Sequence, residues 1–217
     1  DDELLSRFSI PRSVLPEVRL CDARMGEMRT RDGVLALAGA AGDQQSALVG
    51  QGCLRAGEGK ITYGTGLFLL FHTGEKCVSS RNGLLTTVGY ALKSGVAYAL
   101  EGSSFHAGSG IQWLRDGLGL LSSAAESEQI AQSVPDTGGV CFVPAFTGLG
   151  APHWNSEARA LFSGITRGTT RAHLVRAVLE SIAYEARELT DCIRAEGVPL
   201  SAVRCDGGAS ANDFLMQ

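Results

Sequence analysis

Asp43 is the residue of this sequence best placed to do chemistry. It follows Gly42 and precedes Gln44 at the expected start of a helix, where Asp is common as the residue that caps the first free backbone N–H groups. The positive end of the helix dipole would keep its carboxylate ionised. Such a carboxylate can take the proton of an attacking hydroxyl. The residue types alone favour a cap, and the two roles are compatible.

Glycine is unusually frequent, with 28 among 217 residues, and many of the glycines fall in short turns. Without a Cβ, such a turn lets a phosphate or a flat base approach the backbone. The turns that stand out are 64–66, 102–110, 148–150 and 206–209. Each one alone is more often an ordinary tight turn. The P-loop template fails because Gly59-Lys60 is followed by Ile61, and GxGxxG fails because Leu69 stands where the third glycine after Gly64 belongs.

Composition and charge exclude several classes of protein. Asp and Glu outnumber Lys and Arg by 23 to 19, and no basic stripe with interleaved aromatic residues is present, so no nucleic-acid partner is expected. The longest stretch without these charged residues, 137–156, contains two prolines and four glycines and cannot span a membrane. The six scattered cysteines form no CxxC pair, which predicts free thiols in a reducing cytoplasm and no metal site.

The elements that must position these residues alternate between strands and helices. Turn residues and apolar runs predict a β-hairpin over 62–71, a pair of strands over 84–88 and 96–100, and a long helix over 171–196. The other expected elements are a short helix ending near residue 9, a buried strand over 33–42, helices over 43–54 and 104–121, strands over 140–146 and 203–205, and a helix after 208. This order predicts an α/β fold with a mixed sheet and helices packed on it.

Taken together and in order, these segments resemble the FGGY carbohydrate kinase family, and among its members the glycerol kinases. The matching stretches are GDQQSALVGQ (42–51), TYGTGLF (62–68), TGEK (73–76), GLLTT (83–87), YALEGS (98–103), IQWLRD (111–116), VPAFTGLGAP (143–152), LESIAYEAR (179–187) and DGGASANDFLMQ (206–217). The resemblance covers nearly all of the chain and is weakest over 18–40. Several blocks in the same order are far more specific than any single glycine turn.

The resemblance implies two domains of the actin-like, ribonuclease-H-like fold with a catalytic cleft between them. It assigns residues 1–55 to the end of the first domain, with the catalytic-base segment, and 56–217 to most of the second, nucleotide-binding domain, so a truncated fold is expected. The implied reaction is phosphorylation of glycerol to sn-glycerol 3-phosphate by ATP and Mg²⁺, in a cytoplasmic, homo-oligomeric full-length enzyme; the fragment alone is expected to be inactive. Another sugar or polyol kinase of the family, or a non-catalytic actin-like nucleotide-binding module, remains an alternative.

The resemblance also implies roles for individual residues. It makes Asp43 the catalytic base, and Asp43, Gln44 and Phe68 the contacts to glycerol, although a core-facing position is nearly as common for a strand phenylalanine. The implied contacts to ATP are Thr65, Gly108, Gln112, Gly208, Ala209, Ser210, Ala211 and Asn212. Among them, Thr65 would touch the transferred phosphate, and 208–212 would form the adenosine-binding turn. The ordinary structural alternatives are a polar turn residue for Thr65 and an exposed helix residue for Asn212. No metal ligand is implied within the chain.

Overall fold

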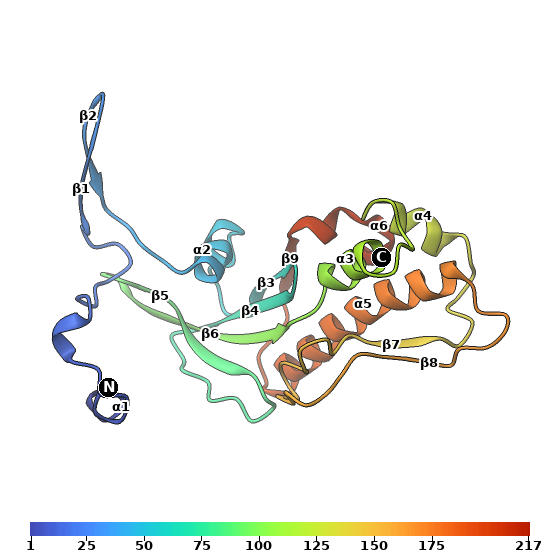
Figure 1. Cartoon of the computed structure of the whole chain (residues 1–217). Helices are drawn as coiled ribbons and strands as arrows, with labels where there is room; N and C mark the ends of the chain where they lie inside the picture. The colour runs from blue at the N-terminus through green and yellow to red at the C-terminus, as the bar shows by residue number, and fades with distance from the viewer.

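The computed structural model describes all residues from 1 to 217, and its centre is a five-stranded mixed sheet (Figure 1). The strand order is β5–β6–β4–β3–β9, with β3 at Glu58–Tyr63, β4 at Leu67–Gly74, β5 at Leu85–Leu92, β6 at Gly95–Ser104 and β9 at Ala202–Asp206. Only β3 and β9 are parallel, and the other neighbours are antiparallel. The prediction of an α/β fold with a mixed sheet is therefore confirmed.

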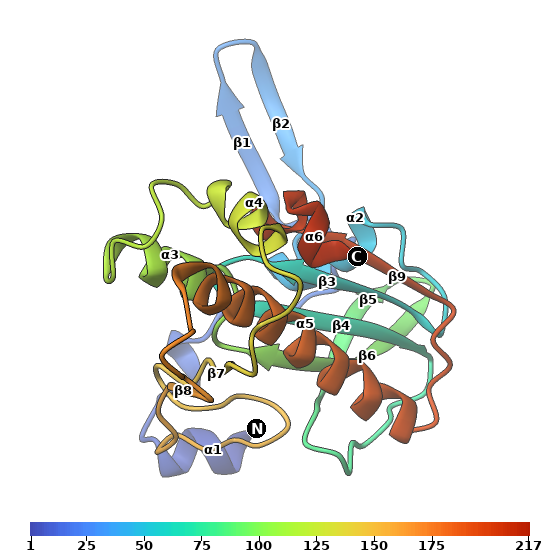
Figure 2. The same ribbon diagram turned by 90° about the vertical axis from the view of Figure 1, so that its right-hand side faces the viewer.

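The sheet is covered on both faces because successive side chains of a strand point to opposite sides. In β4, Leu69 and Phe71 belong to the larger core cluster, whereas Leu70 belongs to a small separate cluster with Leu48. The larger cluster includes the buried side of α5 (Arg171–Ala195), which lies across one face of the sheet in Figure 2. Leu48 is in α2 (Asp43–Gly50), so α2 packs on the opposite face.

A group of short helices gathers beside α5 and forms the end of the molecule that carries the chain's last residues (Figure 1). These elements are α3 (Gly108–Asp116), α4 (Glu126–Gln132), the 3₁₀ helix η2 (Gly208–Ala211) and α6 (Asp213–Met216). A two-stranded sheet of β7 (Cys141–Val143) and β8 (Leu161–Ser163) lies against α5. Both α4 and α6 also pack against α5. None of the helices has the length and apolar character needed to cross a bilayer.

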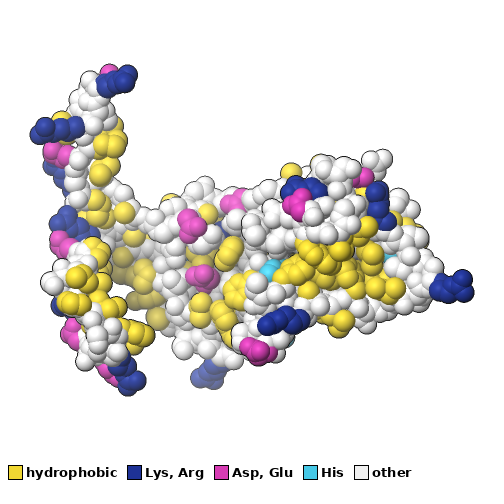
Figure 3. All heavy atoms as spheres, in the orientation of Figure 1, with side chains coloured by type: hydrophobic (Ala, Val, Ile, Leu, Met, Phe, Trp, Pro, Cys, Tyr) yellow, Lys and Arg dark blue, Asp and Glu magenta, His cyan; other side chains and the backbone are white.

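The first forty residues extend away from the sheet and contain α1 (Asp2–Arg7), the 3₁₀ helix η1 (Arg12–Val14) and a hairpin of β1 (Gly26–Thr30) and β2 (Gly33–Leu37). Every residue of β2 is exposed. The strand predicted over 33–42 is present as β2 over Gly33–Leu37, but its predicted burial is wrong, because this apolar run pairs only with β1 and has no second layer against it. Hydrophobic side chains lie along this extended part of the chain in Figure 3. Phe8, Val18 and Leu35 are among its exposed large hydrophobic residues.

The expected boundaries differ from the structure at several helices and strands. The helix predicted over 43–54 begins with Gly42 as its N-cap and ends at Gly50, so Asp43 lies in its first turn and is not its cap. The helix predicted from 104 begins at Gly108, because Ser104 is still paired in β6. The strand predicted over 140–146 is β7 alone. The long helix, the 62–71 hairpin and the short first helix were predicted correctly.

Glu196 joins the end of α5 to the loop before β5. Its Oε1 accepts hydrogen bonds from the Ser80 hydroxyl at 2.6 Å, from the backbone N–H groups of Arg81 (2.7 Å) and Asn82 (2.8 Å), and from the Asn82 side chain at 2.8 Å. Burial acts to raise the pKa of this carboxyl, but these hydrogen bonds outweigh it and hold the pKa below its usual value. The ionised form of Glu196 therefore stabilises the folded chain.

We expect Glu196→Gln to lower the free energy of unfolding by about 2 kcal/mol at pH 7, because the donors lose a charged acceptor. A carboxyl whose pKa is depressed by folding stabilises above its unfolded pKa, and that stabilisation is lost as the pH falls through the folded pKa. The difference between the parent and the variant should therefore shrink below about pH 4. Urea unfolding at pH 7 and at about pH 3.5 measures it, with Glu75→Gln, an exposed residue, as control. A difference that is constant with pH would contradict this assignment.

Candidate nucleotide-binding site

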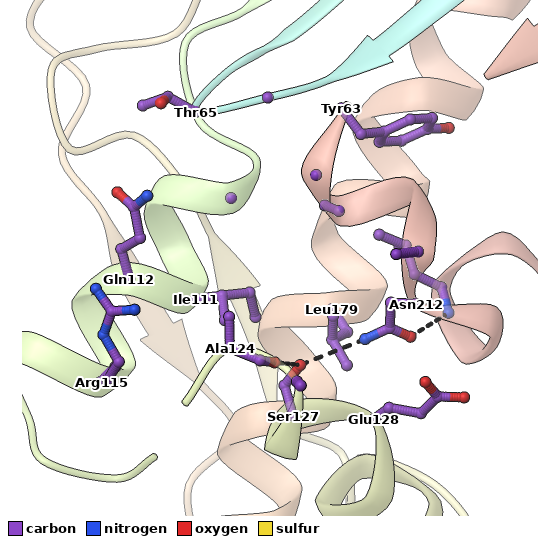
Figure 4. A pocket seen from close by; sticks show the side chains of 17 residues that line it. Tyr63, Thr65, Ile111, Gln112, Arg115, Ala124, Ser127, Glu128, Leu179 and Asn212 are labelled. Atoms are coloured by element: carbon purple, nitrogen blue, oxygen red, sulfur yellow. Dashed lines mark hydrogen bonds between the residues drawn. The ribbon is translucent and has the colours of Figure 1, made fainter. Parts of the chain in front are cut away.

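A cavity of about 510 Å³ opens where β3 and β9 end. These two strands are parallel neighbours, and each is followed by a glycine turn, 64–66 after β3 and 207–208 after β9. Clefts outside the carboxyl ends of parallel strands are the usual ligand sites of open α/β sheets. The walls are completed by α3, α4, η2 and α6, and Leu179 of α5 also lines the cavity (Figure 4).

The turn after β3 is held to the start of α3 by backbone hydrogen bonds. The N–H of Gly108 donates to the carbonyl of Gly64 at 2.9 Å, and the N–H groups of Ala107 and Ser109 donate to the carbonyl of Thr65 at 2.9 and 3.1 Å. A Cβ on Gly108 would lie 2.7 Å from the Gly64 carbonyl oxygen, so only glycine permits this approach. The Thr65 side chain is exposed at the tip, where its hydroxyl makes no hydrogen bond to the protein.

The turn after β9 lies directly against β3. Gly207 has φ +89°, and a Cβ there would lie 2.5 Å from the carbonyl oxygen of Tyr63. The turn leads into α6, whose first turn is capped by Asn212: its Oδ1 accepts the N–H of Leu215 at 2.9 Å. The other end of the same amide donates to the Ser127 hydroxyl at 3.3 Å, across the cavity wall to α4 (Figure 4). Asn212 is therefore held in place and is not a freely exposed helix residue.

The cavity has an apolar wall and a polar rim. Ile111, Leu179 and Leu215 provide apolar surface, and Gln112 of α3 and Glu128 of α4 lie on either side of the opening in Figure 4. Apolar walls with a few fixed polar groups are typical of sites that bind small organic ligands. A flat aromatic base could pack against the apolar side chains while polar groups meet its edge. A phosphate chain would extend toward the glycine turns, where the backbone can be approached closely.

The cavity unites most of the residues that the sequence indicated for nucleotide binding. Thr65, Gly108, Gln112, Gly208, Ala209, Ala211 and Asn212 all line it. Ser210 does not, because its hydroxyl turns back to the Gly207 carbonyl at 2.7 Å. Gly64, from the predicted turn 64–66, also lines the cavity; the lining residues that the sequence did not indicate are Tyr63, Ile111, Arg115, Ala124, Ala125, Ser127, Glu128, Leu179 and Leu215. Arg115 lies three residues after Gln112 on the same face of α3, and this spacing could have indicated it.

Asp43, Gln44 and Phe68 do not line this cavity. Gln44 accepts a hydrogen bond from Lys60, and the backbone carbonyl of Phe68 accepts one from the same ammonium at 3.4 Å. The three residues therefore lie together on the α2 side of the sheet. Asp43 is exposed, and its Oδ1 accepts the neighbouring N–H of Gln44 at 2.8 Å. An exposed carboxylate in the first turn of a helix is free to meet a hydroxyl from solvent or from a bound alcohol.

No group of three or more His, Cys, Asp or Glu side chains in residues 1–217 is arranged to hold a metal ion. Asp43, Glu101 and Asp206 are the acidic residues whose charges act on Lys60. Glu101 lies on β6, where burial raises the pKa of its carboxyl and Lys60 partly opposes the rise. These three carboxylates therefore balance the charge of a buried ammonium and do not form a cluster of metal ligands.

The comparisons with known proteins agree with this architecture. The C-terminal domain of the FGGY family of carbohydrate kinases matches residues 59–217. The chain therefore belongs to the FGGY family of carbohydrate kinases. It is 54% identical to a glycerol kinase of Polaromonas naphthalenivorans and 53% identical to glycerol kinase 2 of Thermotoga maritima, over the whole chain in both cases. It spans about half the length of these curated relatives, 45% and 44%.

Solved structures place the fold in the same family. A Plasmodium falciparum glycerol kinase crystallised with ADP matches with a TM-score of 0.88 and 43% identity, covering 100% of this chain and 44% of that one. A xylulose kinase of Lactobacillus acidophilus matches with a TM-score of 0.79 at 21% identity, covering 99% of this chain and 45% of that one. The second likeness concerns the fold alone. The actin-like, ribonuclease-H-like fold expected from the sequence is confirmed, and the chain contains only part of it.

Proposed function

We propose that this chain is the nucleotide-binding half of a kinase that phosphorylates glycerol to sn-glycerol 3-phosphate at the expense of ATP. The observation that supports this best is the cavity at the carboxyl ends of β3 and β9, lined by most of the residues that the family resemblance indicated for nucleotide contact. The P. naphthalenivorans and T. maritima relatives, 54% and 53% identical to this chain, are glycerol kinases, and the P. falciparum glycerol kinase was crystallised with ADP. Residues 1–55 would then form the C-terminal end of the first domain, and 56–217 would form most of the second.

In the proposed reaction, Asp43 takes the proton of the glycerol hydroxyl as that hydroxyl attacks the γ-phosphorus of ATP; the bond from this phosphorus to the β–γ bridging oxygen breaks, and ADP leaves. Gln44 and Phe68 would contact glycerol, Phe68 through the apolar face of its ring. Thr65 would hydrogen-bond the transferred phosphate, and Gly108, Gln112 and residues 208–212 would hold the nucleotide. Mg²⁺ would enter with the ATP phosphates, neutralising their charge. The full-length protein is proposed to be a cytoplasmic homo-oligomer, with no nucleic acid or membrane as partner.

Isothermal titration calorimetry of the 217-residue chain with ADP tests the nucleotide site. Gln112 is exposed on the cavity rim and makes no hydrogen bond to the protein, so Gln112→Ala should weaken ADP binding about tenfold without changing the fold. Gln129→Ala, a glutamine outside the cavity, is the matched control. Equal ADP affinity of both variants and the parent would contradict the proposed position of the nucleotide.

A full-length chimera tests the reaction itself. Residues 1–217 replace the matching part of T. maritima glycerol kinase 2, to which they are 53% identical. This protein, named the chimera below, should phosphorylate glycerol in a coupled ADP assay. Faster turnover with a sugar or a longer polyol would favour another kinase of the family. ADP binding without turnover of any alcohol would favour a non-catalytic nucleotide-binding module.

A further inference from the structure

Lys60 is the largest of the fully buried side chains, with none of its surface exposed. It lies in the middle of β3, and its neighbour Ile61 faces the larger core, so Lys60 points to the α2 side of the sheet. A buried ammonium is costly unless hydrogen-bond acceptors and opposite charges compensate it. An apolar residue of similar size would avoid this cost, so the contacts of the ammonium are what distinguish Lys60 from such a residue.

The ammonium of Lys60 donates to one side chain of α2. Its Nζ hydrogen-bonds Oε1 of Gln44, the hydroxyl of Thr62 at 2.8 Å and the carbonyl of Phe68 at 3.4 Å. Two of these three residues, Gln44 and Phe68, are proposed to contact glycerol, and the third, Thr62, lies two residues after Lys60 on β3. Gln44 directly follows Asp43, so the position of the Gln44 side chain fixes the first turn of α2 and with it the carboxylate of Asp43.

Three carboxylates surround this ammonium without forming a close ion pair with it. No carboxylate oxygen lies within 4.0 Å of its nitrogen. Burial lowers the pKa of Lys60, whereas Asp206, Glu101 and Asp43, on three different elements, act in the opposite direction. The charge of Lys60 therefore interacts with one carboxylate on each of α2, β6 and β9.

The other end of α2 is tied to the nucleotide side. Nε2 of Gln51, the residue that caps α2, donates to Oδ2 of Asp206 at 2.9 Å. Asp206 is the last residue of β9 and directly precedes Gly207 of the cavity wall. Leu48 is the only buried residue of α2, so apolar packing alone fixes this short helix poorly. Polar contacts at its two ends, Gln44 with Lys60 and Gln51 with Asp206, supply the missing constraint.

We propose that Lys60 is a positioning residue, which holds Gln44 and the first turn of α2 so that Asp43 keeps a fixed place relative to the nucleotide turns. This inference rests on the proposed function. Displacing a reacting group by about 1 Å can cost about 100-fold in rate. In the chimera, Lys60→Met should therefore lower kcat by about 100-fold, with the KM for ATP nearly unchanged because Lys60 does not line the nucleotide cavity.

Two further variants separate positioning from a merely structural role. If Lys60 acts through Gln44, the effects of the two substitutions should not add. The kcat of the double variant Lys60→Met/Gln44→Met should then be no lower than that of the slower of the two single variants. Lys60→Arg keeps a cation and donors, so its kcat should stay well above that of Lys60→Met, although the larger side chain fits the buried site less well. Lys93→Met, an exposed lysine at the β5–β6 turn, is the control.

Hydrogen exchange of the 217-residue chain gives a readout independent of activity. Lys60→Met should speed exchange of the amides in 46–50 more than about tenfold while those of β4 and β6 stay protected. Unchanged exchange in α2, an unchanged kcat, or additive losses in the double variant would each overturn the role of Lys60. An unsubstituted chimera that fails to phosphorylate glycerol would instead contradict the proposed function, and the exchange of α2 would still decide the role of Lys60.

Discussion

The Asp43→Asn variant of the chimera is expected to phosphorylate glycerol about 1,000-fold more slowly than the unsubstituted chimera, within the range usual for loss of a general base. An amide has nearly the shape of a carboxylate but cannot take the proton of the attacking hydroxyl. The fold should be unaffected, because the amide oxygen of the new side chain could still accept the Gln44 N–H that Asp43 accepts at 2.8 Å. ADP affinity should also be unchanged, since Asp43 lies outside the cavity.

A coupled assay of ADP release at saturating glycerol and ATP measures this loss. Asp32→Asn is the matched control, because Asp32 is exposed at the tip of the β1–β2 hairpin and its carboxylate makes no hydrogen bond. The control should retain the rate of the parent. Turnover of Asp43→Asn within about threefold of the parent would exclude Asp43 as the base, and the exposed carboxylate would then be only a helix-terminal charge.

Gly207→Ala is expected to have the largest effect on nucleotide binding, with ADP affinity of the 217-residue chain falling at least about 30-fold. The added Cβ would lie 2.5 Å from the Tyr63 carbonyl oxygen and 2.6 Å from the carbonyl carbon, so the turn must move away from β3. Gly208 and Ala209, which line the cavity, would move with it. Gly207 has φ +89° and ψ 165°, a backbone region that is used almost only by glycine, so alanine there adds roughly 1–3 kcal/mol of strain.

Gly139→Ala separates steric conflict from backbone strain. Gly139 has φ +82°, close to that of Gly207, but nothing lies within 4 Å of the position its Cβ would take. Both variants should lose roughly 1–3 kcal/mol of stability from backbone strain, and only Gly207→Ala should also lose ADP binding. Calorimetry with ADP and thermal melts of both variants provide the measurements. Equal ADP affinity of the two variants would show that the Gly207 turn is not part of the nucleotide site.

Local sequence patterns correctly predicted the elements whose turn residues and apolar spacing lie within one short segment. The β3–β4 hairpin followed from a glycine turn between apolar runs, and α5 followed from its regular apolar positions and the glycine after it. The burial predicted for the strand over 33–42 was wrong, because an apolar run does not reveal whether a second layer covers it. Helix α4 was missed because ESEQIAQ is short and mostly polar, and its buried residues are defined only by packing on α5.

The candidate site was predictable to a similar extent. Glycine turns and the family resemblance indicated the backbone wall of the cavity, but Ser127 and Glu128 enter it from α4, which the sequence did not predict. The sequence did not indicate a role for Lys60 either, because a lysine within a strand is normally exposed. Lys60 is buried because α2 packs over β3. No local sequence pattern specifies that these two segments pack together.

The cavity's construction from distant parts of the chain has a consequence for folding. Tyr63 and Leu215, far apart in the sequence, line the same space, and α3, α4 and α5 contribute from between them. Contacts of such long sequence separation form late and slowly. The site therefore exists only when all of these segments are in place, so a ligand that binds it binds the folded chain and stabilises it against unfolding. At about 100 times its dissociation constant, such a ligand would stabilise the native chain by about 2.7 kcal/mol.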